Sequence, residues 1–129
     1  RIGLSAARGL GLALSIPVLG IPSLLALSLA APAGAPALVL LDARRDEAYV
    51  QHFAAPGRPT DQPQLLPMAE ARRRIAAGDN VLESPFVDIT RLARFAATLD
   101  PALYPPDAAY VRDADAKPQH HFAVARSER

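Results

Sequence analysis

The hydrophobic pattern of this chain is dominated by one uncharged stretch near its start. Residues 9–41 form a run of 33 positions without a charged side chain, and the charged sequence DARRDEAYV follows at once at residues 42–50. A run of that length is compatible with a membrane span, which needs about 20 apolar residues in a single helix. It is equally compatible with the core of a folded domain, and the two interpretations predict different classes of protein.

Prolines favour the folded core. Pro17, Pro22, Pro32 and Pro36 divide the run into segments of at most nine residues. Each proline removes an amide donor and disfavours helical angles at the residue before it. We therefore expect the order helix, buried strand, helix, buried strand, which produces a mostly parallel sheet with nearly continuous apolar strands.

Residues 1–15 are predicted to form a helix that is packed against something. Gly3, Ala7 and Gly11 are spaced four apart, and glycine inside a helix costs up to about 1 kcal/mol relative to alanine. Small residues at that spacing allow another backbone to approach closely, either from the chain's own core or from a partner's helix. The apolar residues that share one side of this helix are Ile2, Ala6, Leu10, Ala13 and Leu14.

The remaining pattern predicts an alternation of strands and helices. Ser23 is a candidate N-cap, and Asp88 caps a helix whose buried stripe we expect to be Ile89, Leu92, Ala93, Ala96 and Leu99. The expected strands are 17–21, 37–42, 47–53 and, interrupted at Pro85, 81–87; the expected helices are 23–31, 68–77 and 89–99. The strands 37–42 and 47–53 should form a hairpin in which Asp46 accepts an unusual backbone angle. Residues 54–67 are predicted to be a surface loop.

Composition narrows the possible functions. The chain has 129 residues, the size of one domain, with a net charge of +1 and no cysteine. These values give no electrostatic argument for nucleic acid and exclude disulfides and thiolate chemistry. Thirteen of the fourteen basic residues are arginine, so arginine here is weak support for phosphate binding.

Few residues are candidates for chemistry. Asp42 ends an apolar strand, where α/β proteins place catalytic carboxylates, but the turn that follows favours a structural role. Asp46 and Glu47 could join it around a metal ion, although neighbours on a turn seldom converge on one. The run Arg72, Arg73 and Arg74 could contact RNA phosphates or form a solvated helix face. His52 has no partner at ligand spacing, and no nucleophile elbow or phosphate-binding loop is present.

Three blocks, in this order, resemble the bacterial TsaB (YeaZ) family, which acts in making the threonylcarbamoyl modification of adenosine 37 in tRNA. The blocks are RIGLSAARGL at 1–10 running into IPVLGI at 16–21, LDARRDEAYV at 41–50, and AYVR at 109–112 followed by DAKP at 115–118. The resemblance implies a partial actin-like, ribonuclease-H-like α/β fold, a mixed sheet with flanking helices, whose N-terminal half is missing. It also implies that residues 1–36 end the first half, 37–118 form a shortened second half and 119–129 are a disordered tail.

The resemblance further implies a role without catalysis. TsaB is similar in fold to the catalytic subunit TsaD, lacks its metal-binding histidines, and pairs with it through a helical bundle that the ATPase TsaE joins. We therefore expect a cytoplasmic, non-enzymatic scaffold without cofactor or metal, which contacts tRNA only indirectly. An alternative partner for the same helix is a second copy of this chain, which would give a homodimer. The expected interface residues are Ile2, Gly3, Ala6, Ala7 and Leu10.

Some positions depart from the family, and other functions stay open. Pro22 and Leu25 stand where a small polar residue and glutamate are expected, and the stretch between Phe53 and Tyr110 is short. One alternative is a TsaD-like glycoprotease or acyl-transfer metalloenzyme, which needs a His-x-x-x-His helix in sequence before Arg1. The other is a membrane-associated protein.

Overall fold

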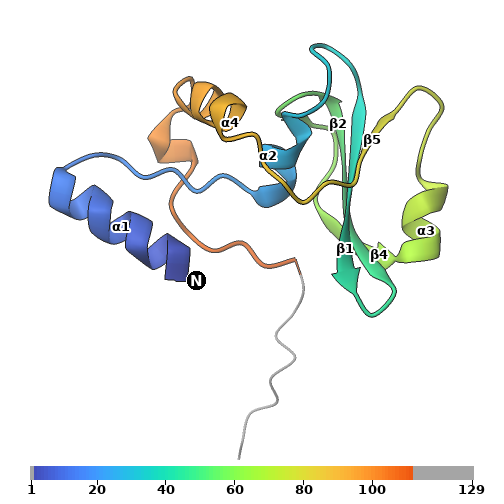
Figure 1. Ribbon diagram of the computed structural model, residues 1–129, viewed down its shortest axis with the longest axis horizontal. Coiled ribbons are helices and arrows are strands. Elements are labelled where there is room, and N and C mark those ends of the chain that lie inside the picture. Colours follow the sequence, from blue (N-terminus) through green and yellow to red (C-terminus); the bar gives the residue numbers. More distant parts are fainter. Residues whose placement is uncertain (1, 112–129) are drawn as a thin grey trace, which may run out of the picture.

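A mixed β-sheet with helices on both faces forms the core of the fold (Figure 1). The computed structural model describes residues 2–111. The helices are α1 (Ile2–Leu14), α2 (Ser23–Ser28), α3 (Met68–Arg73), α4 (Ile89–Ala96) and a 3-10 turn at Pro101–Leu103. The strands are β1 (Ala37–Arg44), β2 (Glu47–Ala55), β3 (Arg58–Pro59), β4 (Gln64–Pro67) and β5 (Asn80–Leu82).

The predicted hairpin is confirmed, and its two strands are the longest and the central strands of the sheet. Strands β1 and β2 pair antiparallel, and the turn between them places Arg44, Arg45 and Asp46 at positive φ angles of 65°, 56° and 59°. Such angles are uncommon outside glycine, although aspartate tolerates them better than most residues. The Asp42 carboxylate supports the turn because its Oδ1 accepts a hydrogen bond from Arg44 N at 2.7 Å. Asp42 therefore has the structural role that its position before a turn indicates.

The pairing of the other strands differs from the expected mostly parallel sheet. Only β5 runs parallel to β1, whereas β3 and β4 both pair antiparallel with β2. The prediction of a loop over residues 54–67 is therefore wrong, since the chain folds back twice along β2. Both new strands are short and contain a proline, Pro59 in β3 and Pro67 in β4. Proline is tolerated at the ends and edges of strands. The prolines of this segment therefore indicated a loop, although the segment contains two short strands.

The core has two sides because β1 is buried on both faces. On one face, leucines of α2 pack against Val39 of β1 and Phe53 of β2. On the other face, Leu38 and Leu40 contact Ala71 of α3. The apolar run in β1 is thus explained by helices on both sides of the sheet.

The segment 17–21, predicted to be a buried strand, is irregular. Its Gly20 N donates to Tyr104 O at 2.9 Å, and no strand of the described chain runs beside it. Prolines at 17 and 22 limit the donors that it could offer to a sheet. Helix α2 follows with Pro22 rather than Ser23 at the N-cap position and without a side-chain cap, so that the Ser23 prediction is wrong.

Helix α4 begins as predicted but is less buried than predicted. Asp88 is the N-cap, and its Oδ1 accepts from Arg91 N at 3.0 Å. However, Ile89 is 70% exposed and no residue of α4 is fully buried. The helix is instead fixed at the β2–β3 turn, where the Phe95 ring occupies the space that a side chain at Gly57 would need.

The described residues bear on the alternative of a membrane span but not on the predicted tail. No helix within residues 2–111 has the length and apolarity required for a membrane crossing. The predicted tail, 119–129, and the DAKP block lie outside the described residues. The division into segments 1–36 and 37–118 stays a prediction.

Candidate functional site

Helix α1 presents the largest set of exposed apolar side chains in the described chain. It lies apart from the sheet, at the end of the molecule opposite α3 (Figure 1). Ile2 is 89% exposed, Leu12 86% and Leu10 63%, and within α1 only Gly11 is buried. An apolar helix that remains exposed along most of its length is typical of a surface made for a partner.

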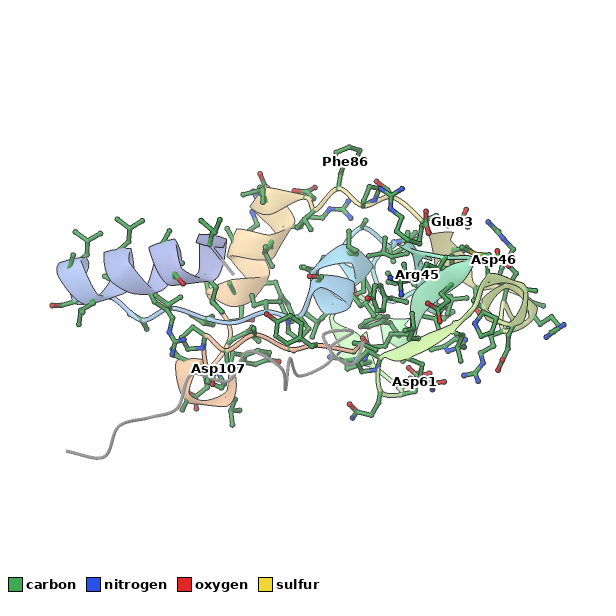
Figure 2. All side chains as sticks on the ribbon, turned by 90° about the horizontal axis from the view of Figure 1, so that it is seen from below. Arg45, Asp46, Asp61, Glu83, Phe86 and Asp107 are labelled. Atoms are coloured by element: carbon green, nitrogen blue, oxygen red, sulfur yellow. The ribbon has the colours of Figure 1, made fainter. Side chains whose placement is uncertain are left out.

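One side of α1 is attached to the rest of the chain. Gly11 packs against Val18 and lies beneath the carbonyl of Ile16, leaving no room for a Cβ atom. A hydrogen bond from Ile16 N to Gly11 O at 3.0 Å also joins the segment after α1 to the end of the helix. Arg8, one turn earlier, lies 3.5 Å from the carboxylate of Asp107. Figure 2 shows Asp107 below α1.

The opposite side of α1 is a stripe of small and apolar residues. Ile2, Ala6, Gly9 and Ala13 follow one another at spacings of four, three and four, which aligns them along one face of a helix. All of them are exposed. A Cβ atom added at Gly9, or at Gly3, would meet no atom within 4 Å. Packing within residues 2–111 therefore gives no reason for glycine at these positions.

The expected interface residues can now be located. Ile2, Gly3, Ala6 and Leu10 are exposed on α1, whereas Ala7 is half-buried beside the attached side. Among the described residues, the close approach predicted for small residues spaced four apart is found at Gly11 and not at Gly3. Leu12, which the sequence interpretation did not single out, is as exposed as Ile2. Whether these residues meet a partner stays a prediction.

The acidic and basic candidates have structural surroundings. No three side chains of His, Cys, Asp or Glu within the described ranges are grouped as metal ligands are. Asp46 contributes its backbone carbonyl, which accepts from Met68 N at 2.8 Å and joins the hairpin turn to α3. Figure 2 shows Arg45 and Asp46 together at this end of the molecule, away from α1.

The arginine run of α3 is partly neutralised by neighbouring groups. Arg72 lies 3.0 Å from Glu83, and Arg74 lies 3.3 Å from Glu70 and donates to Gln64 Oε1 at 2.7 Å. Surface arginines paired with carboxylates have less charge to offer to phosphates. This arrangement supports the solvated helix face over an RNA contact.

His52 has a partner that the sequence interpretation missed. Its ring Nδ1 lies 3.1 Å from Asp61 Oδ2, and its backbone N donates to Asp61 Oδ1 at 2.9 Å. The other ring nitrogen lies 3.2 Å from Arg74 O. His52 thus connects β2, the loop after β3 and the end of α3. No local spacing signals this pair, because it depends on how the chain folds back along β2.

A cavity of about 650 Å³ lies on the α2 face of the sheet. Its walls come from four segments that are distant in the sequence: the start of α2, the faces of β1 and β2, the loop 59–63, and residues 109–111. Among its lining residues are Leu41, Tyr49 and Gln51 of the hairpin, and Tyr110 from the end of the described chain. No local sequence pattern indicates this cavity, because its walls come from segments that only the fold brings together.

The mixed sheet with helices on both faces makes this an α/β protein, and two solved structures have a similar fold. The chain is similar to an uncharacterised Pseudomonas aeruginosa protein with similarity to the peptidase YeaZ, at 23% identity and TM-score 0.59, covering 87% of this chain and 67% of that one. It is also similar to YeaZ from Pseudomonas aeruginosa, at 24% identity and TM-score 0.54, covering 75% and 59%. The chain therefore has part of the actin-like, ribonuclease-H-like α/β fold of YeaZ and spans about three fifths to two thirds of these structures.

Sequence comparison gives the family. Residues 1–74 match the model of TsaD: tRNA N6-adenosine threonylcarbamoyltransferase. Since this match spans more than half of the 129 residues, the chain belongs to the TsaD family. No curated protein matches the sequence. The resemblance to this group of proteins, and the partial actin-like α/β fold that it implied, are confirmed.

Proposed function

We propose that this chain is a non-catalytic scaffold subunit of the tRNA threonylcarbamoyladenosine system, and that it pairs through α1 with a TsaD-like catalytic subunit. Family membership supports the connection with this modification. The observation that carries the pairing is the exposure of α1: of its 13 residues, Gly11 is the one buried by the described chain.

The energetics of α1 favour a partner. Burying a leucine or isoleucine side chain gains about 1.5 to 3 kcal/mol relative to leaving it in water. Ile2, Leu10 and Leu12 are all exposed, so a second helix that covers any one of them would stabilise the pair by about that value. Isolated helices of about 12 to 15 residues are only marginally stable in water, which adds to the benefit of packing.

The small residues of α1 supply a suitable geometry. Ala6, Gly9 and Ala13 leave a shallow groove along the exposed face, into which the ridge of another helix could fit. A second copy of this chain could use the same face, and the ATPase TsaE could join through the resulting complex. In this proposal tRNA contacts the assembly chiefly through the catalytic subunit.

An arginine placed on the exposed stripe tests the proposal. Ala6→Arg should abolish co-purification with a TsaD-like subunit, because a charged side chain would have to be buried between the helices. Ala6 is a cleaner choice than Ala7, whose half-buried position also contributes to the attachment of α1. Ala93→Arg on the exposed side of α4 is the matched control and should pair normally. Undiminished pairing of Ala6→Arg would overturn the proposal.

A second candidate is transferase activity in the protein that carries this chain, which the name of the matched family favours. It predicts threonylcarbamoyl transfer to tRNA in the absence of any other subunit, with a requirement for bound metal. Activity of the purified protein that is lost on chelation would favour this candidate over the scaffold. A dependence of all activity on an added catalytic subunit would exclude it.

A further inference from the structure

The cavity on the α2 face has the size and apolar walls of a small-molecule site. Its volume of about 650 Å³ falls within the range of roughly 300 to 1,000 Å³ that is common for ligand pockets. Leu41 and Tyr49 are directly opposite each other in the hairpin, and Gln51 lies two residues further along β2 on the same face. The floor of the cavity is therefore built on rigid, paired strands.

The charges around the cavity disfavour anions. No lining residue within the described chain is basic, and Asp61 is the one acidic residue among them. Both oxygens of the Asp61 carboxylate are already engaged by the backbone and ring of His52. A phosphate or carboxylate entering here would lose its hydration without gaining a cation, which is costly. A neutral ligand would not meet this penalty.

One wall residue supplies a polar contact. Gln51 is 7% exposed, and its Nε2 donates to Asp61 O at 2.9 Å, which fixes the orientation of the amide. Within residues 2–111, no hydrogen bond to Gln51 Oε1 is formed. A buried acceptor without a donor is unfavourable, so a ligand that brings an N–H or O–H group would satisfy it.

Aromatic rings complete the site. Tyr49 rises from the sheet, and Tyr110 comes from the segment 109–111 that forms another wall. Aromatic side chains pack well against flat apolar ligands. We propose that this cavity binds a neutral aromatic compound that carries a hydrogen-bond donor, with the donor directed at Gln51. This site is separate from α1 and does not depend on the pairing proposed for that helix.

Two related fluorescent probes test the class of ligand. N-phenyl-1-naphthylamine is neutral and carries an N–H group, and 8-anilino-1-naphthalenesulfonate adds a sulfonate to the same ring system. In titrations of the full chain, the neutral probe should bind at one site and at least about tenfold more tightly than the sulfonate, since the cavity offers the anion no cation. Equal affinity for the two probes, or no binding of the neutral one, would overturn the proposal and leave the cavity as a surface for a polypeptide.

Variants locate the bound probe. Ala109→Trp and Ser23→Trp add bulk to two different walls at exposed positions, and each should abolish binding of the neutral probe. Gln51→Leu should weaken binding about threefold to tenfold, the effect of one hydrogen bond of roughly 1 kcal/mol. Leu12→Lys on α1 is the control for binding at other apolar surfaces and should leave the affinity unchanged. Binding that is lost in Leu12→Lys but retained in both tryptophan variants would contradict the assignment.

Discussion

Val18 packs against Gly11 so closely that a Cβ atom at Gly11 could not be accommodated without movement of the chain. This contact is what attaches α1 to the irregular segment that follows it. Gly9, two residues earlier on the same helix, faces open space. Two glycines of one helix therefore have different physical meanings, and substitution of each by the same residue distinguishes them.

Gly9→Ala should stabilise α1, whereas Gly11→Ala should loosen it. Alanine at position 9 improves helix propensity by up to about 1 kcal/mol without a clash. At position 11 the new methyl group would overlap Val18, and overpacking of this kind costs about 1 to 3 kcal/mol. Hydrogen exchange of the α1 amides, followed by mass spectrometry, should slow in the first variant and accelerate in the second. The same change in both variants would show that α1 is not held at Gly11.

Ser28→Ala should destabilise the fold, and Ser23→Ala should not. The buried Ser28 hydroxyl donates to Leu25 O at 2.7 Å and accepts from Gly57 N at 3.0 Å, joining α2 to the β2–β3 turn. Its removal leaves the Gly57 amide without this acceptor, at a cost of about 1 to 3 kcal/mol. Ser23 is exposed and makes no cap, so it is the control. Urea denaturation measures both values, and equal midpoints would contradict the role of Ser28.

Asp61→Ala should release the loop after β3 from β2. The substitution removes the two contacts to His52, at 2.9 Å and 3.1 Å, and leaves the backbone amide of His52 without its acceptor. We expect a loss of about 1 to 2 kcal/mol in the free energy of unfolding. Asp61→Asn keeps an acceptor for the amide and should lose less. If limited proteolysis cleaves residues 59–63 at the same rate in all three proteins, the contacts do not hold the loop.

Asp88→Ala should shorten or melt the start of α4. The Asp88 carboxylate satisfies Arg91 N at 3.0 Å, and loss of an N-cap costs about 0.5 to 2 kcal/mol. Asp88→Asn retains a capping oxygen and should preserve most of the stability. Far-UV circular dichroism and thermal unfolding compare the variants. An alanine variant as stable as the wild type would mean that the Asp88 cap does not contribute to the stability of α4, which other contacts such as that from Arg91 Nη1 to Leu29 O would then maintain.

Local signals in the sequence predicted the parts of the fold that depend on neighbours in the chain. Apolar segments on both sides of a charged turn predicted the hairpin, Pro17 predicted the end of the first helix, and Asp88 predicted the start of α4. These features depend on backbone angles and hydrogen bonds within a few residues, which the order of residue types is sufficient to determine. The order of three short blocks was also sufficient to identify the family.

Tertiary structure alone decided which surfaces are covered. The chain folds back along β2, where a proline-rich segment forms the antiparallel strands β3 and β4. This path also brings Asp61 into contact with His52. It also decided that α1 is covered at Gly11 and exposed at Ile2, and that residues 109–111 line the same cavity as Gln51. These contacts join residues that are far apart in the sequence, so their energies depend on the path of the whole chain rather than on local spacing. The uncharged run at 9–41 determined that a core would form, and the fold decided that its first part, α1, lies largely outside it.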